Sequence, residues 1–244
     1  MTDGSIAKCR GCHGGPLREV LRMDPMPLAG VFCRTLYEAR SAARYPLTWT
    51  QCGACRLVQV LEDVDDDVLF KTYNYASSTI PGLVKHFESY AAWIAGRFGS
   101  GPVRLLEIGC NDGVLLRRLP SAYRMLGVDP SDVARNAAAG PYELYNASFS
   151  SSTSERIPGA GEYDVVTASN CLAHIADLRD VFAGVRDVLR PGGAFVIEVH
   201  DLEATLRSGQ WDTIYHEHKA EWSVGSLCTC LAPFGFVLED VERH

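Results

Sequence analysis

A run of protonatable side chains in the last part of the chain has the residue types that proton transfer requires. Tyr215, His216, Glu217 and His218 follow one another directly, and His174 comes after an earlier strand-like segment. A histidine takes or gives a proton near neutral pH, a carboxylate orients it, and a tyrosine hydroxyl donates a hydrogen bond to developing oxyanion charge. The run lacks the HExxH spacing of zinc peptidases. A lone histidine is more often a surface or packed residue, but this group together favours acid–base chemistry.

Two CxxC pairs near the amino end have the spacing of a metal site. Cys9 and Cys12 form the first pair, and Cys52 and Cys55 form the second. Each CxxC turn brings two thiolates to one side of a tight loop, and two turns complete a tetrahedral site that suits Zn²⁺. Because a four-thiolate site leaves no open coordination position, we expect a structural zinc ion rather than a catalytic one. A redox pair is the alternative.

The segment LLEIGCNDGVLL has the residues of a cofactor-binding turn. Glu107, Gly109 and Gly113 give the spacing E-x-G-x-x-x-G, which differs from the GxGxxG loop that cradles a pyrophosphate. The acidic Glu107 and Asp112 would repel a pyrophosphate but attract a sulfonium and an ammonium group. Asp129 follows about 20 residues later, where an acid accepts hydrogen bonds from ribose hydroxyls. These motifs resemble those of class I methyltransferases and predict an S-adenosylmethionine site; a nicotinamide dinucleotide domain is the alternative.

Further cofactor contacts are expected beyond the loop. Phe149 follows the third predicted strand and, like similar residues, is expected near the adenine, with core packing as the alternative. The full expected set is Glu107, Gly109, Asn111, Gly113, Asp129, Phe149 and Asn170.

The elements that must position these residues alternate between strand and helix patterns. A helix is expected within 77–98, where apolar residues recur on one face. Strands are then expected at 103–110, 123–130, 142–148, 163–170 and 191–200, with helices at 113–119, 132–139 and 177–190. This alternation predicts an α/β fold with a parallel, doubly wound, Rossmann-like sheet. Ligands of such folds bind beyond the carboxyl ends of the strands.

The motifs suggest three consecutive domains. We expect a small zinc-binding domain over 1–62, a helical connector that contributes to the active site over 63–102, and an S-adenosylmethionine-binding domain that carries the YHEH segment over 103–244.

The charge and hydropathy of the chain bear on its partners and location. The formal net charge of −7 disfavours a nucleic-acid backbone as partner, because phosphate contacts need clustered Lys and Arg. No apolar stretch is long enough for a transmembrane helix, and the amino end lacks the apolar core of a secretory signal. A cytosolic protein with a small-molecule substrate is the expectation.

Taken in order, these motifs resemble one family. They are CRGC, MDPMPLAGVF, YPLTWTQCGACRLVQV, YNYASS, LEIGCNDG, NCLAHIADL and DTIYHEHKAEWSVGSL. The chain is similar to the zinc-containing C-methyltransferases that act on nucleotide-linked deoxysugars in antibiotic pathways. The resemblance implies a 4-keto nucleotide sugar as substrate, usually a thymidine diphosphate sugar, methylated at C-3. It also implies removal of the C-3 proton and attack of the resulting enolate carbon on the sulfonium methyl group.

The resemblance assigns roles to individual side chains. His218 is the implied base, positioned by Tyr215 and Glu217. His174 would act at the sugar or the enolate oxygen, and a tyrosine of YNYASS would complete the pocket. That tyrosine is Tyr75 or, less favoured, Tyr73, while His216 is assigned to orientation or structure.

The chain departs from this family at its end. Family members carry a further α/β domain after the cofactor domain, whereas this sequence stops about where that domain should begin, after an expected strand at 234–244. The oligomeric state is either a monomer or a homodimer, and a homodimer would cover the side of the cleft that the missing domain leaves open. An O- or N-methyltransferase on a small natural product and a non-catalytic S-adenosylmethionine-binding partner protein remain alternative functions.

Overall fold

The computed structural model describes residues 6–29, 32–65, 68–69 and 75–243, which form two compact units. The parallel-sheet unit comprises Tyr73–Cys171 and Asp180–Glu198. The antiparallel-sheet unit comprises Met1–Thr72, Leu172–Arg179 and Val199–His244. This division differs from the three consecutive domains expected, since the last part of the chain belongs with the first. Among the described helices, none has the length and apolar character needed to cross a bilayer.

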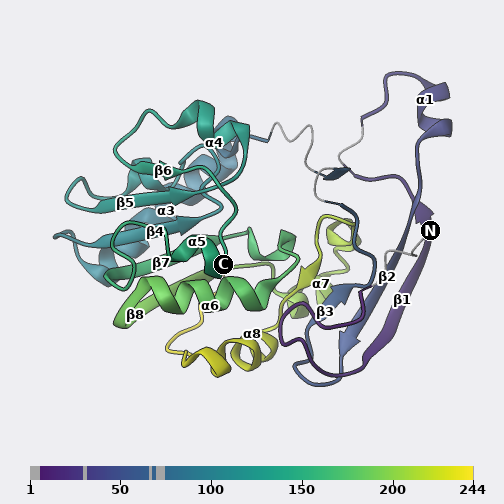
Figure 1. Cartoon of the computed structure of the whole chain (residues 1–244). Coiled ribbons are helices and arrows are strands. Elements are labelled where there is room, and N and C mark those ends of the chain that lie inside the picture. Colours follow the sequence, from purple (N-terminus) through teal and green to yellow (C-terminus); the bar gives the residue numbers. More distant parts are fainter. Residues whose placement is uncertain (1–5, 30–31, 66–67, 70–74, 244) are drawn as a thin grey trace. The chain divides into compact units, whose positions relative to one another are not determined.

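The parallel-sheet unit contains all five strands that the alternating pattern predicted. They are β4 (Arg104–Ile108), β5 (Arg124–Val128), β6 (Glu143–Tyr145), β7 (Tyr163–Ser169) and β8 (Leu189–Glu198). Their order in the sheet is β6-β5-β4-β7-β8, and each neighbouring pair is parallel (Figure 1). Numbered along the chain this is 3-2-1-4-5, the doubly wound arrangement, so the expected α/β fold is confirmed.

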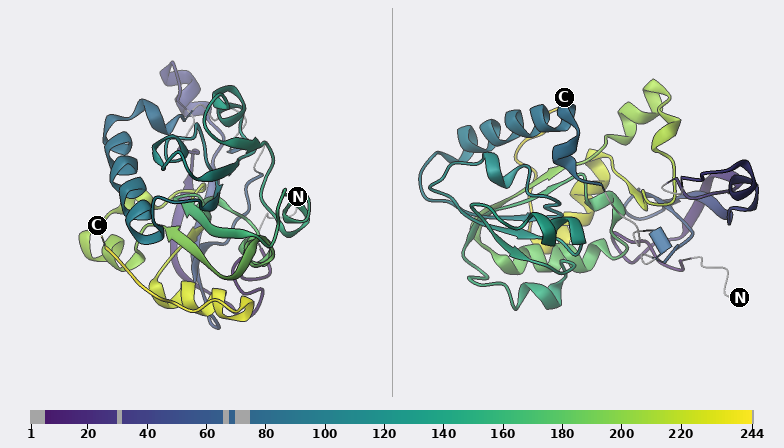
Figure 2. Two further views of the ribbon diagram at one scale, coloured as in Figure 1. Left: turned by 90° about the vertical axis from the view of Figure 1, so that its left-hand side faces the viewer. Right: turned by 90° about the horizontal axis from the view of Figure 1, so that it is seen from above.

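Helices cover both faces of this sheet (Figure 2). On one face lie α3 (Pro81–Phe98) and α4 (Asp132–Ala137), and the other face carries α5 (Ser151–Ser154) and α6 (Leu178–Val188). Phe87, Ala91 and Ile94 of α3 are buried at helical spacing and pack into the core beside β4. A short 3₁₀ turn, η1 (Ser77–Thr79), precedes α3.

The helix expected over 113–119 is wrong. Only a 3₁₀ turn, η2 (Leu116–Arg118), forms there, after a series of turns. Asn111 and Gly113 have φ angles of 48° and 73°, in the left-handed region, which an α-helix cannot contain. A side chain at Gly113 would overlap the Tyr142 ring. The close approach of that ring therefore fixes a glycine turn where the apolar pattern indicated a helix.

The antiparallel-sheet unit is built from segments far apart in the sequence. Its sheet has the order β1-β2-β3-β9 and joins β1 (Leu17–Met26), β2 (Tyr45–Cys52), β3 (Val58–Val60) and β9 (Ala220–Glu221). The core combines Leu47, Trp49, Val58 and Val60 with Leu202 and Ile214. The first 60 residues therefore depend on the last part of the chain to complete a hydrophobic core.

Short helices make up the rest of this unit. They are α1 (Leu36–Ser41), η3 (Leu172–His174), α7 (Leu202–Ser208), η4 (Trp211–Thr213), α8 (Val224–Leu231) and η5 (Ala232–Phe234). The strand expected at 234–244 is wrong, because residues 236–243 have no regular secondary structure. Gly235 (φ 85°) ends η5, and Val237, Leu238 and Val241 after it are exposed.

Candidate functional site

The four cysteines of the two CxxC pairs form one cluster. The sulfur atoms of Cys9, Cys12, Cys52 and Cys55 all lie within 4.8 Å of one another. The Cys9–Cys55 sulfur distance is 3.5 Å and the Cys12–Cys52 distance is 3.6 Å. A tetrahedral Zn²⁺ with bonds of about 2.3 Å needs sulfur separations of about 3.8 Å. The cluster therefore has the dimensions of a zinc–tetrathiolate site.

The surroundings of the thiols are also compatible with a bound cation. The hydrogen bond to Cys55 and burial raise the pKa of Cys9. Bound Zn²⁺ would hold such thiols as thiolates, since metal binding displaces their protons. Backbone N–H groups of Gly14 and Ala54 donate to the sulfurs of Cys12 and Cys52, each at 3.4 Å. These residues therefore fit zinc with all four positions filled.

The cofactor loop lies beyond the carboxyl end of β4, in the parallel-sheet unit. Gly109 has a φ of 72°, and a Cβ there would come within 2.6 Å of the Cys171 side chain. The N–H of Asn111 donates to Asp129 Oδ2 at 2.9 Å. Asp129 is buried at the end of β5, and its other oxygen accepts from the N–H of Ser131 at 2.8 Å. A hydrogen bond therefore joins the loop to Asp129, the expected ribose-binding acid.

Glu107 is a buried carboxylate inside this loop region. It is 2% exposed, and its Oε2 has no hydrogen-bond partner among the described residues. Burial raises its pKa well above the usual value, and nearby carboxylates of Asp129, Asp112 and Glu198 add to the shift. A cluster of buried acids with an orphaned oxygen fits a cationic ligand. The ammonium group and sulfonium of S-adenosylmethionine supply such a charge.

The remaining expected cofactor residues lie near the ends of later strands. Phe149 is buried and packs against Gly184 of α6, which agrees with the core-packing alternative. Asn170 follows β7 with a φ of 54°, and its side-chain amide donates to Glu198. His86 Nε2 lies 2.7 Å from the other Glu198 oxygen. Sequence reasoning missed His86 and Glu198, although an acid ending a strand was a usable signal.

In the antiparallel-sheet unit, His218 lies at the centre of an aromatic cluster. Its ring centroid is 4.2 Å from that of Tyr215, 5.1 Å from that of His174 and 5.4 Å from that of His200. His218 is 5% exposed, whereas His200 is exposed. His200 was not predicted, although it follows β8 as His174 follows β7. We refer to His174, His200, Tyr215 and His218 as the histidine cluster.

Hydrogen bonds define the tautomer of His218. Nδ1 lies 2.9 Å from the carbonyl oxygen of Thr213, which only accepts, so Nδ1 carries the proton. Nε2 lies 2.7 Å from the Tyr215 hydroxyl, and in the neutral form of the ring it accepts a hydrogen bond from that hydroxyl. The buried Glu221 carboxylate lies 3.5 Å from Nδ1. His218 is therefore oriented with Nε2 toward Tyr215 and with Nδ1 toward the Glu221 carboxylate.

The His174 side chain contacts the backbone of Glu217. His174 Nδ1 donates to the Glu217 carbonyl at 2.9 Å. Burial, and then the neighbouring His218, lower the pKa of His174 to about 4, so its ring is neutral at neutral pH. Burial raises the pKa of the Glu217 carboxyl. His216 instead packs against β2, with Nε2 near the carbonyls of Tyr45 and Pro46, which is a structural arrangement.

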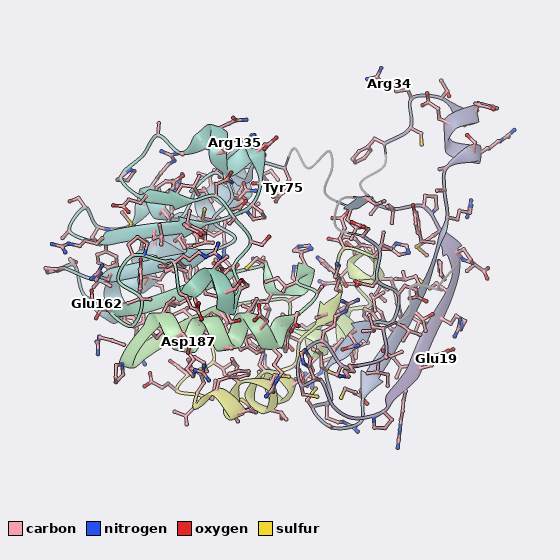
Figure 3. The ribbon with its side chains drawn as sticks, viewed as in Figure 1. Glu19, Arg34, Tyr75, Arg135, Glu162 and Asp187 are labelled. Atoms are coloured by element: carbon pink, nitrogen blue, oxygen red, sulfur yellow. The ribbon has the colours of Figure 1, made fainter. Side chains whose placement is uncertain are left out.

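Tyr75 and the four other expected catalytic residues belong to different compact units. Tyr75 belongs to the parallel-sheet unit, where its carbonyl accepts from the Asn111 amide at 2.9 Å. Its side chain is exposed at the surface (Figure 3). The structure thus brings His174, Tyr215, Glu217 and His218 together and places Tyr75 with the cofactor loop. Tyr73 lies outside the described residues.

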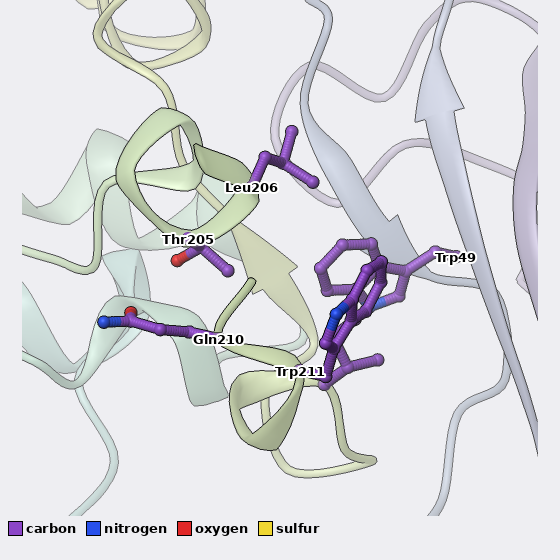
Figure 4. Close-up of a pocket in the computed structure, with 6 residues that line it drawn as sticks. Trp49, Thr205, Leu206, Gln210 and Trp211 are labelled. Carbon is purple, nitrogen blue, oxygen red and sulfur yellow. The ribbon is translucent and has the colours of Figure 1, made fainter. Parts of the chain in front are cut away.

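A narrow apolar pocket lies beside η4, just before Tyr215 in the chain. Trp49 and Trp211 line one side of it, with Thr205 and Gln210 across from them (Figure 4). Its volume of about 10 Å³ holds about one water molecule. It is therefore a packing defect of the antiparallel-sheet unit, too small for a sugar or a nucleotide.

Comparisons with known proteins identify a methyltransferase domain and a zinc binding domain. A family model described as a methyltransferase domain matches residues 57–241, and a zinc binding domain model matches residues 9–70. The C-methyltransferase NovU of Streptomyces niveus is 32% identical over 241 residues, covering 97% of this chain and 57% of NovU. A ubiquinone biosynthesis O-methyltransferase of Aromatoleum aromaticum is 29% identical over 109 residues, covering 41% of this chain and 45% of that enzyme. The chain thus spans about half the length of these relatives.

Solved structures share the fold. PH0226 of Pyrococcus horikoshii superposes with a TM-score of 0.53 and 16% identity, covering 67% of this chain and 87% of that one. YcgJ of Bacillus subtilis gives a TM-score of 0.52 with 18% identity, covering 65% of this chain and 71% of that one. The methyltransferase-domain match covers most of the chain, and the sheet order and cofactor loop agree with it. The chain therefore belongs to the S-adenosylmethionine-dependent methyltransferases and carries a zinc-binding domain at its amino end.

Proposed function

We propose that the protein is a C-methyltransferase that acts at C-3 of a 4-keto thymidine diphosphate deoxysugar, through an enolate, in antibiotic deoxysugar biosynthesis. The observation that carries the proposal is the Tyr215–His218 pair, in which a buried imidazole presents its basic nitrogen to a hydroxyl at 2.7 Å. The similarity to NovU, named as a C-methyltransferase, supports transfer to carbon.

The parallel-sheet unit would hold the methyl donor. Glu107 and its neighbouring acids suit the cationic end of the cofactor, and Asp129 suits the ribose. When bound, S-adenosylmethionine supplies an electrophilic methyl group on a sulfonium centre. The expected contacts of Gly109, Asn111 and Asn170 follow from their places at the carboxyl ends of β4 and β7.

The antiparallel-sheet unit would perform the proton chemistry. The 4-ketone acidifies the C-3 proton, which His218 accepts at Nε2 once the Tyr215 hydroxyl turns to the substrate oxygen. The Nδ1–H bond to Thr213 and the carboxylate of Glu221 stabilise the resulting imidazolium. Tyr215 donates a hydrogen bond to the enolate oxygen, and neutral His174 contacts the sugar.

Isotope exchange tests the enolate route without the cofactor. In D₂O, the wild-type protein is expected to exchange the C-3 hydrogen of a thymidine diphosphate 4-keto-deoxysugar for deuterium. His218→Ala should abolish this exchange while keeping its zinc content and its affinity for S-adenosylmethionine, which show that both units are intact. Wild-type protein that binds the cofactor yet exchanges no deuterium would contradict the proposal.

Transfer to oxygen is the second candidate, because several relatives are ubiquinone biosynthesis O-methyltransferases. The Tyr215–His218 pair suits removal of a hydroxyl proton equally well. The NMR spectrum of the product made with a ¹³C-methyl donor separates a methyl group on carbon from one on oxygen.

A further inference from the structure

Arg10 lies between the first two cysteines of the metal cluster, and its side chain is almost completely buried. It is 4% exposed, and its backbone N–H donates to Gln59 Oε1 at 3.0 Å. Its Nη2 donates to the Glu62 carbonyl at 3.2 Å and to Asp63 Oδ1 at 3.1 Å. A buried guanidinium that donates to two acceptors from one nitrogen is fixed in direction.

The Asp63 carboxylate connects Arg10 to the segment that carries the proposed base. The same Oδ1 atom lies 3.5 Å from Lys219 Nζ. Lys219 is 2% exposed and directly follows His218. One carboxylate oxygen of Asp63 therefore contacts both Arg10, in the Cys9–Cys12 turn, and Lys219, which follows the proposed base.

The first knuckle also contacts the segment that carries His174. Arg10 Nη1 lies 3.5 Å from the carbonyl of Ala176, two residues after His174. His13 Nε2 lies 3.0 Å from Asp177 Oδ1. Both histidine-bearing segments are thus held from one CxxC turn.

We propose that Arg10 and Asp63 are positioning residues. They hold the segments that carry His174 and His218 in place against the Cys9–Cys12 turn. Their importance for catalysis rests on the proposed function, whereas their effect on the two imidazole rings does not. A displacement of about 1 Å in a catalytic group is enough to slow a reaction about 100-fold.

Two variants test this proposal against matched controls. Asp63→Asn removes the shared charge without changing shape, and Arg10→Lys keeps the charge but loses the planar guanidinium and its Nη1 and Nη2 donors. Glu19→Gln and Arg22→Lys make the same changes in an exposed ion pair on β1 of the same unit. The measurements are zinc content, ¹⁵N–¹H correlations of the histidine rings, and KM and kcat for deuterium exchange into the thymidine diphosphate 4-keto-deoxysugar.

The expected result is retained zinc, shifted ring signals of His174 and His218, and a fall in kcat of about 10- to 100-fold. KM should change little, and both controls should match the wild type. Ring signals and kcat that are unchanged in Asp63→Asn would overturn the proposal. If Arg10→Lys loses zinc, Asp63→Asn decides, because Asp63 lies outside the knuckle. If the wild type exchanges no deuterium, the proposed function fails, and the ring signals alone decide whether Arg10 and Asp63 position the histidines.

Discussion

The Tyr215 hydroxyl lies 2.7 Å from His218 Nε2, while Nδ1 of the same ring donates to the Thr213 carbonyl. Both nitrogens of the buried imidazole are therefore engaged within a single short segment. This arrangement fixes the tautomer needed for a base and leaves the tyrosine hydroxyl as the group that must turn for the ring to act.

Tyr215→Phe should slow deuterium exchange more than it weakens substrate binding. The variant loses the hydrogen bond to His218 and the donor for the enolate oxygen, and acid–base groups typically contribute about 100-fold or more to a rate. We expect kcat to fall by about that factor with little change in KM. Steady-state kinetics of exchange measure both, and Tyr37→Phe, at an exposed tyrosine of α1, serves as the control. An unchanged kcat would remove Tyr215 from the reaction.

Glu107→Gln should stabilise the free protein and weaken cofactor binding. The pKa of Glu107 is raised by burial and by three carboxylates, so the ionised form is unfavourable in the folded state. Removing the charge relieves that cost, but it also removes the attraction for a cationic ligand, worth about 1.5–3 kcal/mol for a charged hydrogen bond. Urea denaturation should show a higher midpoint, and calorimetry should show affinity for S-adenosylmethionine lowered about 10- to 100-fold. Affinity equal to that of the wild type would mean that Glu107 does not face the cofactor.

The stability of the protein should fall with acidification through the titration of His174. Its pKa is lowered from 6.5 to about 4, so between these values the unfolded chain binds more protons than the folded one. The neutral ring therefore contributes stability that is fully present above about pH 6.5 and is lost as the pH falls toward 4. His174→Asn should show a smaller dependence on pH, by up to about 1.4 kcal/mol per pH unit. Thermal melts across this window, compared with the wild type, measure the difference. Equal slopes would mean that His174 has the same pKa in the folded and the unfolded protein.

Loss of zinc should unfold the antiparallel-sheet unit. Metal binding supplies folding energy to small sites of four thiolates. Cys55→Ser should lower the zinc content well below one ion per chain and reduce the melting temperature. Cys33→Ser, at an exposed cysteine outside the cluster, should match the wild type. A zinc-free protein with an unchanged melting temperature would show that the metal has no structural role.

The sequence predicted the parallel sheet well because its strands are continuous apolar runs bounded by turns. It predicted the cysteine cluster equally well because each CxxC turn places its two thiols by local geometry, and a tetrahedral metal needs both turns. It failed at 113–119, where a tyrosine ring distant in sequence fixes a glycine in the left-handed region. It also missed His200, a single residue whose importance comes from its distance to His218.

The division into units had no local signal. The pairing of β9 with β3 involves only two residue pairs, across a separation of more than 150 positions in the chain. A two-residue strand is too short to show a hydrophobic period. Leu202 and Ile214, which complete the core of this unit, lie in or beside short helices that have no distinctive sequence pattern. Such long-range pairing depends on tertiary contacts rather than on pattern.

That pairing has a consequence during synthesis. The parallel-sheet unit lies within residues 73–198, so it is able to form as soon as that stretch has left the ribosome. The metal cluster emerges first, but the sheet beside it lacks its last strand until residues 220–221 arrive. The four cysteines must therefore wait, with their thiols accessible, for a segment that is synthesised much later. Zinc bound early would protect those thiols until then and would hold the two CxxC turns together for the later pairing of β3 with β9.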